Sequence, residues 1–285
     1  MIGTLNEGAL HAQLKEWYRR PGDLLEQKVG GYVIDLVRDG LLVEFQTGGF
    51  APLRKKLDAL AQEHRVRLVA PVAVNRRIVR LSDDGEILSS RRSPRHGCVH
   101  DVFDRLVSIP ALVAHPNFEL EILLTDQDEL RMFQPGRAYR RRGWVVQGRS
   151  LVSVEQSVLI SGPAEVAQLL PKLEATFGTA ELAAASSISR RLAQRMAYCL
   201  RALDVIVPVG KRGGAVLYAR SNDRRTGSSA TGTAPGGRAA PRAARRQERQ
   251  PNLRGCGGTQ ESRTALESRA RGSTSTQGRS AQRLR

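Results

Sequence analysis

The chain has 285 residues, 40% of them apolar, and a formal net charge of +17, which together indicate one or two folded domains. It contains no run of about 18 apolar residues, which argues against a membrane-spanning helix and a membrane partner. The three cysteines lack the spacing of a zinc ribbon and the N-terminus lacks a secretory leader pattern, so we expect a cytoplasmic protein.

A first helix is predicted to begin at Thr4, because Thr4 and Glu7 have the spacing of a capping box. Leu10, Leu14 and Trp17 follow at intervals that place their side chains on one face of the helix. This apolar stripe predicts that the helix packs against a core.

Two strands joined by a tight turn are predicted next, over Val33 to Val37 and Leu41 to Gln46. Asp39-Gly40 between them is typical of a type I′ turn, which requires a positive φ at both central positions. A two-residue loop fixes the register of the hairpin. The expected pairs are Arg38 with Leu41, Val37 with Leu42, Leu36 with Val43, and Asp35 with Glu44.

The expected pairing of Asp35 with Glu44 creates a conflict, because like charges directly across a hairpin destabilise it by about 0.2–1 kcal/mol. Their apolar neighbours add a cost of desolvation. A divalent cation would remove the conflict, since carboxylates are the oxygen ligands that Mg²⁺ prefers. The pattern therefore predicts a metal site, and ordinary strand acids that face solvent are the alternative.

Asp35 followed by Glu44-x-Gln46 on the next strand resembles the catalytic motif of the PD-(D/E)xK nuclease superfamily, which has a restriction-endonuclease-like fold. The resemblance implies that Asp35 and Glu44 hold Mg²⁺ or Mn²⁺. It also implies that Gln46 orients water or phosphate. An acidic residue of the first helix reaches the metal in many members, and Glu7 has that position here, with helix capping as its alternative role.

Two residues depart from the motif of that superfamily. Gln46 stands where most members have Lys, and Ile34 stands where they have Pro. Lys56, in the helix predicted after the hairpin, is a candidate for the missing ammonium group. The departures leave the metal site as an expectation and leave the third catalytic group open.

The order of the predicted elements agrees with this resemblance. The chain reads helix, three strands, helix, strand, which is the core order of the superfamily. We therefore predict an α/β fold with a restriction-endonuclease-like mixed sheet flanked by helices over residues 1–160. Two glutamates of a later strand, Glu119 and Glu121, are expected to face solvent. Besides the hairpin, the predicted strands are Leu24 to Val29, Val66 to Val72, Arg76 to Leu81, Glu86 to Ser89, Phe118 to Thr125 and Leu151 to Ile160, and the predicted helices are Phe50 to Glu63 and Val99 to Val107.

A basic run precedes an aromatic residue near the end of this domain. Arg140, Arg141 and Arg142 lie just before Trp144. Arginines beside an aromatic ring are suited to holding a phosphate backbone and stacking on a base. A solvated loop is the alternative interpretation of the same run.

Residues 161–220 are predicted to form a second, small domain that resembles a winged helix-turn-helix. Its expected elements are Pro163 to Leu170, Thr179 to Ala185 and Ser189 to Leu203 as helices, and Val205 to Val209 and Ala215 to Tyr218 as strands. The second helix of a helix-turn-helix enters the major groove by its N-terminal end. The resemblance therefore implies DNA contacts by Arg190, Arg191, Gln194, Arg195, and, at the wing tip, Lys211 and Arg212. A protein-interaction or dimer module is the alternative.

Residues 221–285 differ sharply in composition from the rest of the chain. They contain 14 arginines and four acidic residues, but no lysine, aromatic residue, isoleucine or valine. Such a segment buries too little apolar surface to offset the entropy of ordering. We predict a disordered, Arg-rich tail, which is either a genuine nucleic-acid-binding segment or a frameshift product.

The predicted function is that of a metal-dependent nuclease that hydrolyses DNA phosphodiester bonds and binds duplex DNA through the winged helix. The expected cofactor is Mg²⁺ or Mn²⁺. No phosphate-binding loop of the G-x-x-x-x-G-K-[ST] type occurs, so no nucleotide cofactor is expected. The alternative is a non-catalytic DNA-binding protein or transcriptional regulator on an inactive nuclease scaffold, and a homodimer is compatible with either.

Overall fold

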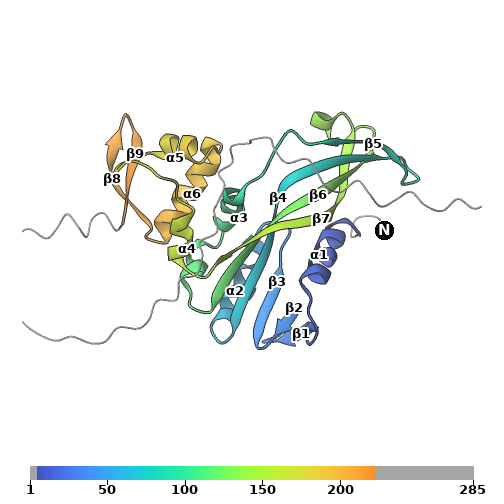
Figure 1. Cartoon of the computed structure of the whole chain (residues 1–285), viewed down its shortest axis with the longest axis horizontal. Coiled ribbons are helices and arrows are strands. Elements are labelled where there is room, and N and C mark those ends of the chain that lie inside the picture. The colour runs from blue at the N-terminus through green and yellow to red at the C-terminus, as the bar shows by residue number, and fades with distance from the viewer. Residues whose placement is uncertain (1–4, 222–285) are drawn as a thin grey trace, which may run out of the picture.

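The structure is a computed structural model that describes residues 5–221, without the side chains of residues 5–7. It has an α/β architecture built on a seven-stranded mixed sheet with helices on both faces (Figure 1). Thr4, the side chain of Glu7 and the tail after Ser221 lie outside the described residues, so the predictions made for them stay predictions. Within residues 5–221, no helix is long and apolar enough to cross a membrane.

The first part of the chain confirms the predicted order of helix, three strands, helix, strand. The strands β1, β2 and β3 form an antiparallel meander, and β4 then lies parallel to β3. A parallel neighbour requires a crossover connection, which α2 supplies. The bounds are α1 Leu5–Tyr18, β1 Leu24–Val29, β2 Tyr32–Arg38, β3 Leu41–Phe45, α2 Arg54–Ala61 and β4 Arg65–Leu81.

The β2–β3 hairpin has the predicted turn and most of the predicted register. Asp39 and Gly40 both have positive φ, at 48° and 77°. The three pairs nearest the turn form as expected, but the ladder ends at Leu36 with Val43, and the fourth predicted pair is absent from it. The Asp35 carboxylate accepts a hydrogen bond from the Phe45 amide at this level, and the β1–β2 ladder also omits the level, where Glu26 has a φ of 51°. The regular pleat is interrupted at Asp35.

The long strands of the sheet were only partly predicted. The two strands predicted over Val66 to Val72 and Arg76 to Leu81 are one strand, β4, with a bulge between Ala73 and Asn75. Its polar half stays in the sheet because its arginines meet acidic residues of β6, for example Arg77 with Asp128. The other bounds are β5 Ile87–Arg92, β6 Phe118–Phe133 and β7 Trp144–Ile160, with the 3-10 helix Val99–Val102 and α3 Phe103–Leu106 between β5 and β6.

Helix α1 covers one face of the sheet, where it buries Leu10, Leu14 and Tyr18 against a small core. Trp17 does not belong to this stripe, since half of its surface is exposed. The spacing of four residues from Leu10 to Leu14 continues to Tyr18, which explains the difference. Helices α2 and α3 lie on the opposite face and contribute to the larger core.

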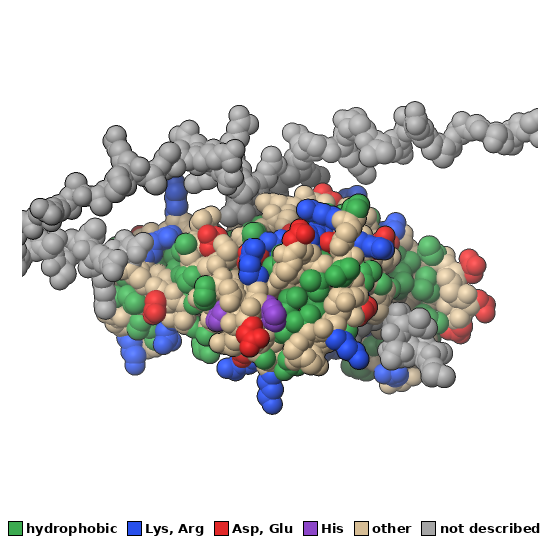
Figure 2. All heavy atoms as spheres, turned by 90° about the horizontal axis from the view of Figure 1, so that it is seen from below, with side chains coloured by type: hydrophobic (Ala, Val, Ile, Leu, Met, Phe, Trp, Pro, Cys, Tyr) green, Lys and Arg blue, Asp and Glu red, His purple; other side chains and the backbone are tan. Residues whose placement is uncertain are grey.

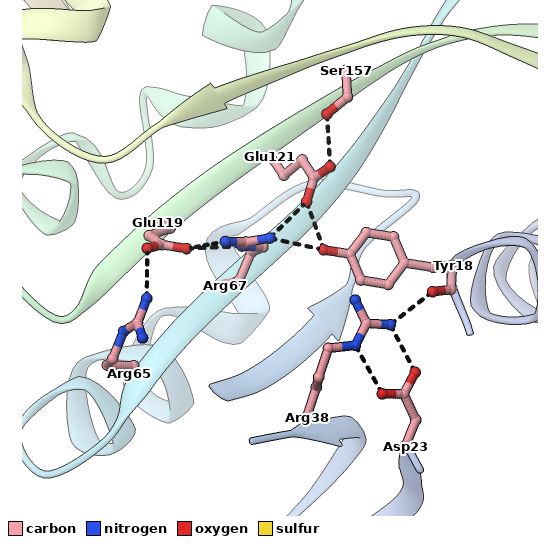
Figure 3. A network of polar contacts seen from close by, with 8 residues as sticks. All are labelled: Tyr18, Asp23, Arg38, Arg65, Arg67, Glu119, Glu121 and Ser157. Carbon is pink, nitrogen blue, oxygen red and sulfur yellow. Dashed lines mark hydrogen bonds and ion pairs between the residues drawn. The ribbon is translucent and has the colours of Figure 1, made fainter. Parts of the chain in front are cut away.

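A polar network fixes the C-terminal end of α1 to the sheet (Figure 3). The Tyr18 hydroxyl donates to Glu121 at 2.7 Å, and Arg67 of β4 lies 2.6 Å from Glu119 and 3.4 Å from Glu121. Glu121 also accepts a hydrogen bond from Ser157 of β7. The prediction that Glu121 faces solvent is therefore wrong, because partners from three elements compensate for its burial.

Residues 163–220 form a smaller unit whose apolar side chains join the larger core. Its elements are α4 Pro163–Gln168, α5 Thr179–Ala185, α6 Arg190–Ala202, β8 Ile206–Arg212 and β9 Ala215–Arg220. Helix α6 buries the predicted face of Leu192, Met196 and Cys199. The strands β8 and β9 form an antiparallel hairpin, and Phe177 adds a bridge to Tyr218 of β9.

Candidate functional site

Asp35 of β2 is held by side chains of α1. His11 Nε2 and the Phe45 amide lie 3.1 and 2.9 Å from its Oδ2, and Lys15 Nζ lies 3.5 Å from Oδ1. His11 and Lys15 are four residues apart, so they project from the same side of the helix. Burial raises the pKa of Asp35, but the hydrogen bonds from His11 and Phe45 outweigh it and hold the pKa below its ordinary value. The bond to Asp35 raises the pKa of His11.

Glu44 of β3 is held from the other side of the sheet by Lys56 of α2. Only 8% of its surface is exposed, and Lys56 Nζ lies 2.6 Å from Oε1. The same ammonium donates to the Val33 carbonyl at 2.7 Å. The second oxygen, Oε2, is buried and has no hydrogen-bond partner among the described residues. Burial and the charge of Asp35 raise the pKa of Glu44 despite the opposing effect of Lys56.

The two carboxylates are therefore neighbours with opposite pKa shifts, and their cationic partners come from helices on opposite faces of the sheet. Asp35 contacts α1, whereas Glu44 contacts α2. The interrupted pleat at Asp35 brings this about, and it also places the Asp35 amide as a hydrogen-bond donor to Glu44. Environments that push the pKa values of two acids apart are typical of catalytic sites.

A divalent cation needs several oxygen or nitrogen donors that surround one point. Within residues 5–221, no group of three or more His, Cys, Asp or Glu side chains could hold a metal ion. Mg²⁺, however, is commonly bound by one or two carboxylates, with water and substrate phosphate as the other ligands. The unpartnered Oε2 of Glu44 is such a carboxylate oxygen, and Asp35, whose oxygens contact His11, Lys15 and the Phe45 amide, is the neighbouring candidate ligand.

Gln46, the predicted third catalytic residue, follows β3 and is turned toward the next loop. Its amide group donates to the Gly49 carbonyl at 2.6 Å. It makes no hydrogen bond to Asp35 or Glu44 in the described part of the chain. Lys56, the candidate for the missing ammonium, occupies the position next to Glu44 instead.

His11 and Lys15 were not identified as site residues from the sequence. Their spacing of four shows that they share a helix face, but nothing in the sequence connects that face to Asp35. Only the packing of α1 on β2 and β3 does so.

Three of the four predicted DNA-contacting residues of α6 are exposed. Arg190, Arg191 and Gln194 are exposed at its N-terminal end. Arg195, in contrast, lies 2.6 Å from Asp104 of α3. This ion pair joins the two parts of the molecule, so the structure assigns Arg195 to packing rather than to the exposed face.

The β8–β9 turn carries the predicted wing residues. Lys211 is exposed, and Arg212 lies 2.8 Å from Glu181 of α5. Both side chains of that ion pair are largely in solvent, so it contributes little stability and leaves the arginine accessible.

The basic run before Trp144 lies in the loop between β6 and β7. Arg140, Arg141 and Arg142 are exposed. The Trp144 ring packs against Phe133 and is covered by Arg80 at 4.5 Å, so the predicted stacking role does not fit it. Tyr139, which is 96% exposed, is the free aromatic side chain of this loop.

Surface charge does not single out an interface on the face shown in Figure 2. On the face in Figure 2, Lys and Arg side chains are dispersed among acidic and apolar ones. The defined features are the hairpin carboxylates, the exposed end of α6 and the β6–β7 loop.

The molecule thus belongs to the α/β proteins with a mixed sheet flanked by helices, and it has an acidic pair on a central hairpin. Residues 8–161 match a family model described as "Domain of unknown function (DUF8091)", and the chain belongs to this family. An "Uncharacterized protein" of Treponema pallidum (strain Nichols) is 30% identical over 221 residues, which are 76% of this chain and 86% of that protein. No solved structure matches the chain significantly.

Proposed function

We propose that the chain is a metal-dependent nuclease that hydrolyses phosphodiester bonds of DNA. The observation that carries this proposal is that Asp35 and Glu44 are neighbours on the β2–β3 hairpin with opposite pKa shifts, and that Lys56 contacts Glu44. The three side chains supply two carboxylates with different pKa values and one ammonium group. These are the groups implied by the resemblance to PD-(D/E)xK nucleases, with Lys56 in place of the motif lysine.

The order and pairing of the elements support a restriction-endonuclease-like fold for this domain. Helix α1 and the meander β1–β2–β3 precede α2, which leads into the parallel strand β4. The hairpin with the carboxylates thus lies inside the core arrangement that the resemblance implies. For residues 163–220, the bridge from Phe177 to β9 and the order α4, α5, α6, β8, β9 support a winged helix that binds duplex DNA.

Each site residue has a definite role in this proposal. Asp35 and Glu44 hold the cation, which supplies activation of water and charge stabilisation when it is bound. Lys56 opposes the rise in the pKa of Glu44, and its third ammonium hydrogen is left for a phosphate oxygen. His11 and Lys15 orient Asp35 from α1, which makes them positioning residues rather than catalytic ones.

The test is a cleavage assay of the full chain on supercoiled, linear and branched DNA and on RNA, with Mg²⁺ or Mn²⁺. Asp35→Asn and Glu44→Gln each remove one negative charge from the site. Asp58→Asn, on the exposed side of α2, is the matched control. We expect cleavage by the wild type and the control and at least a hundredfold loss, about 3 kcal/mol, in both site variants. Cleavage that survives either site substitution, or no cleavage of any substrate, would refute the proposal.

A non-catalytic DNA-binding protein on the same scaffold is the second candidate. It is favoured by the neutralisation of both carboxylates by His11, Lys15 and Lys56, which lowers their need for a cation. Absence of cleavage together with duplex binding that is lost in Arg190→Glu/Arg191→Glu would establish this candidate instead.

A further inference from the structure

A cavity of about 300 Å³ lies next to the candidate site and is unusually rich in arginine. Leu10 of α1, which precedes His11, and Thr47, which follows Gln46, both line it. The cavity therefore lies close to the hairpin site. Its charged lining consists of Arg76, Arg95, Arg105 and Arg149 with Asp101 and Asp104.

Arg105 of α3 is largely buried and lacks a carboxylate partner within the described residues. It donates to the carbonyls of Pro71 at 2.8 Å and Gln46 at 3.3 Å, and it lies over the Phe50 ring. Burial lowers its pKa to about 10. A buried guanidinium that is bound only by carbonyl groups keeps its full charge to offer to an anion.

Arg76 and Arg149 are also short of partners. The Nε atom of each is buried and has no hydrogen-bond partner in the described part of the chain. Both lie near one carboxylate, that of Glu129, at 3.5 and 3.8 Å. Glu129 is bound more closely by Arg131, at 2.5 Å. Three guanidinium groups thus share one carboxylate as their counter-ion.

The two acidic residues of the cavity lining do not balance this charge. Asp104 is bound by Arg195 at 2.6 Å, and Asp101 lies 3.6 Å from Arg95 and accepts a hydrogen bond from the Cys98 amide. The lining therefore has an excess of positive charge, and its buried donors lack acceptors. An anion with several oxygen acceptors would satisfy both deficits, and a phosphate group matches the fork of a guanidinium.

We propose that this arginine cavity binds a phosphate group of a nucleic-acid strand, adjacent to the phosphate at the hairpin site. A second cavity, of about 340 Å³, shares Arg76 and Gln127 with the first and adds Arg92, whereas its Arg77 is paired with Asp128. A lining that continues past Arg76 to the exposed Arg92 suits a polymer of phosphates better than a single small anion. The assignment of the strand as substrate rests on the proposed nuclease function, whereas the binding of phosphate does not.

The test separates binding from cleavage. All measurements use the full-length Asp35→Asn protein in EDTA, with Arg149→Gln or Arg95→Gln added. The matched control adds Arg19→Gln instead, which changes an exposed residue directly after α1. Anisotropy with a labelled oligonucleotide should show about tenfold weaker binding for each cavity variant, as expected for one lost charge-assisted contact. The slope of log K against log salt should fall by about one. The Arg19→Gln control should change neither quantity.

A second arm identifies the source of the phosphate. Thermal unfolding is measured with inorganic phosphate and with chloride at equal ionic strength. Stabilisation by phosphate that Arg149→Gln abolishes, together with weaker oligonucleotide binding, supports the proposal. Stabilisation by phosphate with unchanged oligonucleotide binding would refute a nucleic-acid strand as the ligand and indicate a free phosphate compound instead. If neither phosphate nor the oligonucleotide responds to the cavity substitutions, the cavity is not a phosphate-binding site. The proposed nuclease activity is tested separately, by cleavage with the wild-type protein.

Discussion

Substitution of Lys56 by Ala offers a direct measurement of the buried charge at the hairpin. Lys56 and Glu44 are both mostly buried, and their charged atoms lie 2.6 Å apart. Without Lys56, Glu44 must either stay ionised in the interior or take up a proton. Protonation of a glutamate with an unfolded-state pKa of about 4.3 costs about 4 kcal/mol at pH 7, which sets an upper limit to the loss. Removing one partner of a buried pair costs about 3–5 kcal/mol in other proteins, which agrees with this limit.

The pH dependence distinguishes this mechanism from simple loss of packing. A carboxyl group whose folded-state pKa is raised destabilises the protein as the pH rises from the unfolded-state pKa toward the folded-state pKa. The difference between wild type and Lys56→Ala should therefore shrink to about 1 kcal/mol at pH 5. Lys55→Ala, which changes an exposed neighbour, should cost less than about 0.5 kcal/mol at both pH values.

Urea unfolding followed by tryptophan fluorescence and circular dichroism provides the free energies of unfolding. The double variant Glu44→Gln/Lys56→Ala should regain a large part of the lost stability at pH 7, because it buries no charge. An equal loss for Lys56→Ala at pH 5 and pH 7, or no recovery in the double variant, would refute the reasoning.

Two further predictions concern α1 and the network in Figure 3. The raised pKa of His11 means that its pair with Asp35 stabilises the fold fully below about pH 6.5 and less as the pH rises through the folded-state pKa. Unfolding of wild type and His11→Gln from pH 6 to 9 should show this converging difference, and a constant difference would contradict it. Arg67→Met should cost about 3 kcal/mol, because it leaves the buried Glu121 without a cation, whereas the exposed Arg65→Met should cost less than about 1 kcal/mol. Equal losses in urea unfolding would contradict the assignment of the network to Arg67.

The local patterns of the sequence were sufficient for most elements. Asp39-Gly40 defined the hairpin turn because few residues tolerate positive φ at both positions, and the three pairs next to it followed from the loop length. The apolar face of α6 followed from a period that only a helix satisfies. These features depend on neighbours within a few residues, so the sequence alone determines them.

The environment of each charge was decided by the tertiary structure. Glu121 was expected in solvent because alternation in β6 directs it away from the apolar face, yet α1 covers that second face and supplies Tyr18. The level of Asp35 is missing from both ladders of β2, next to a positive φ at Glu26 in a different strand. Burial and pairing of charges arise from residues far apart in the chain, whereas propensity and periodicity act locally. The sequence therefore determined the candidate acids and their hairpin, and the tertiary structure decided which cations they meet.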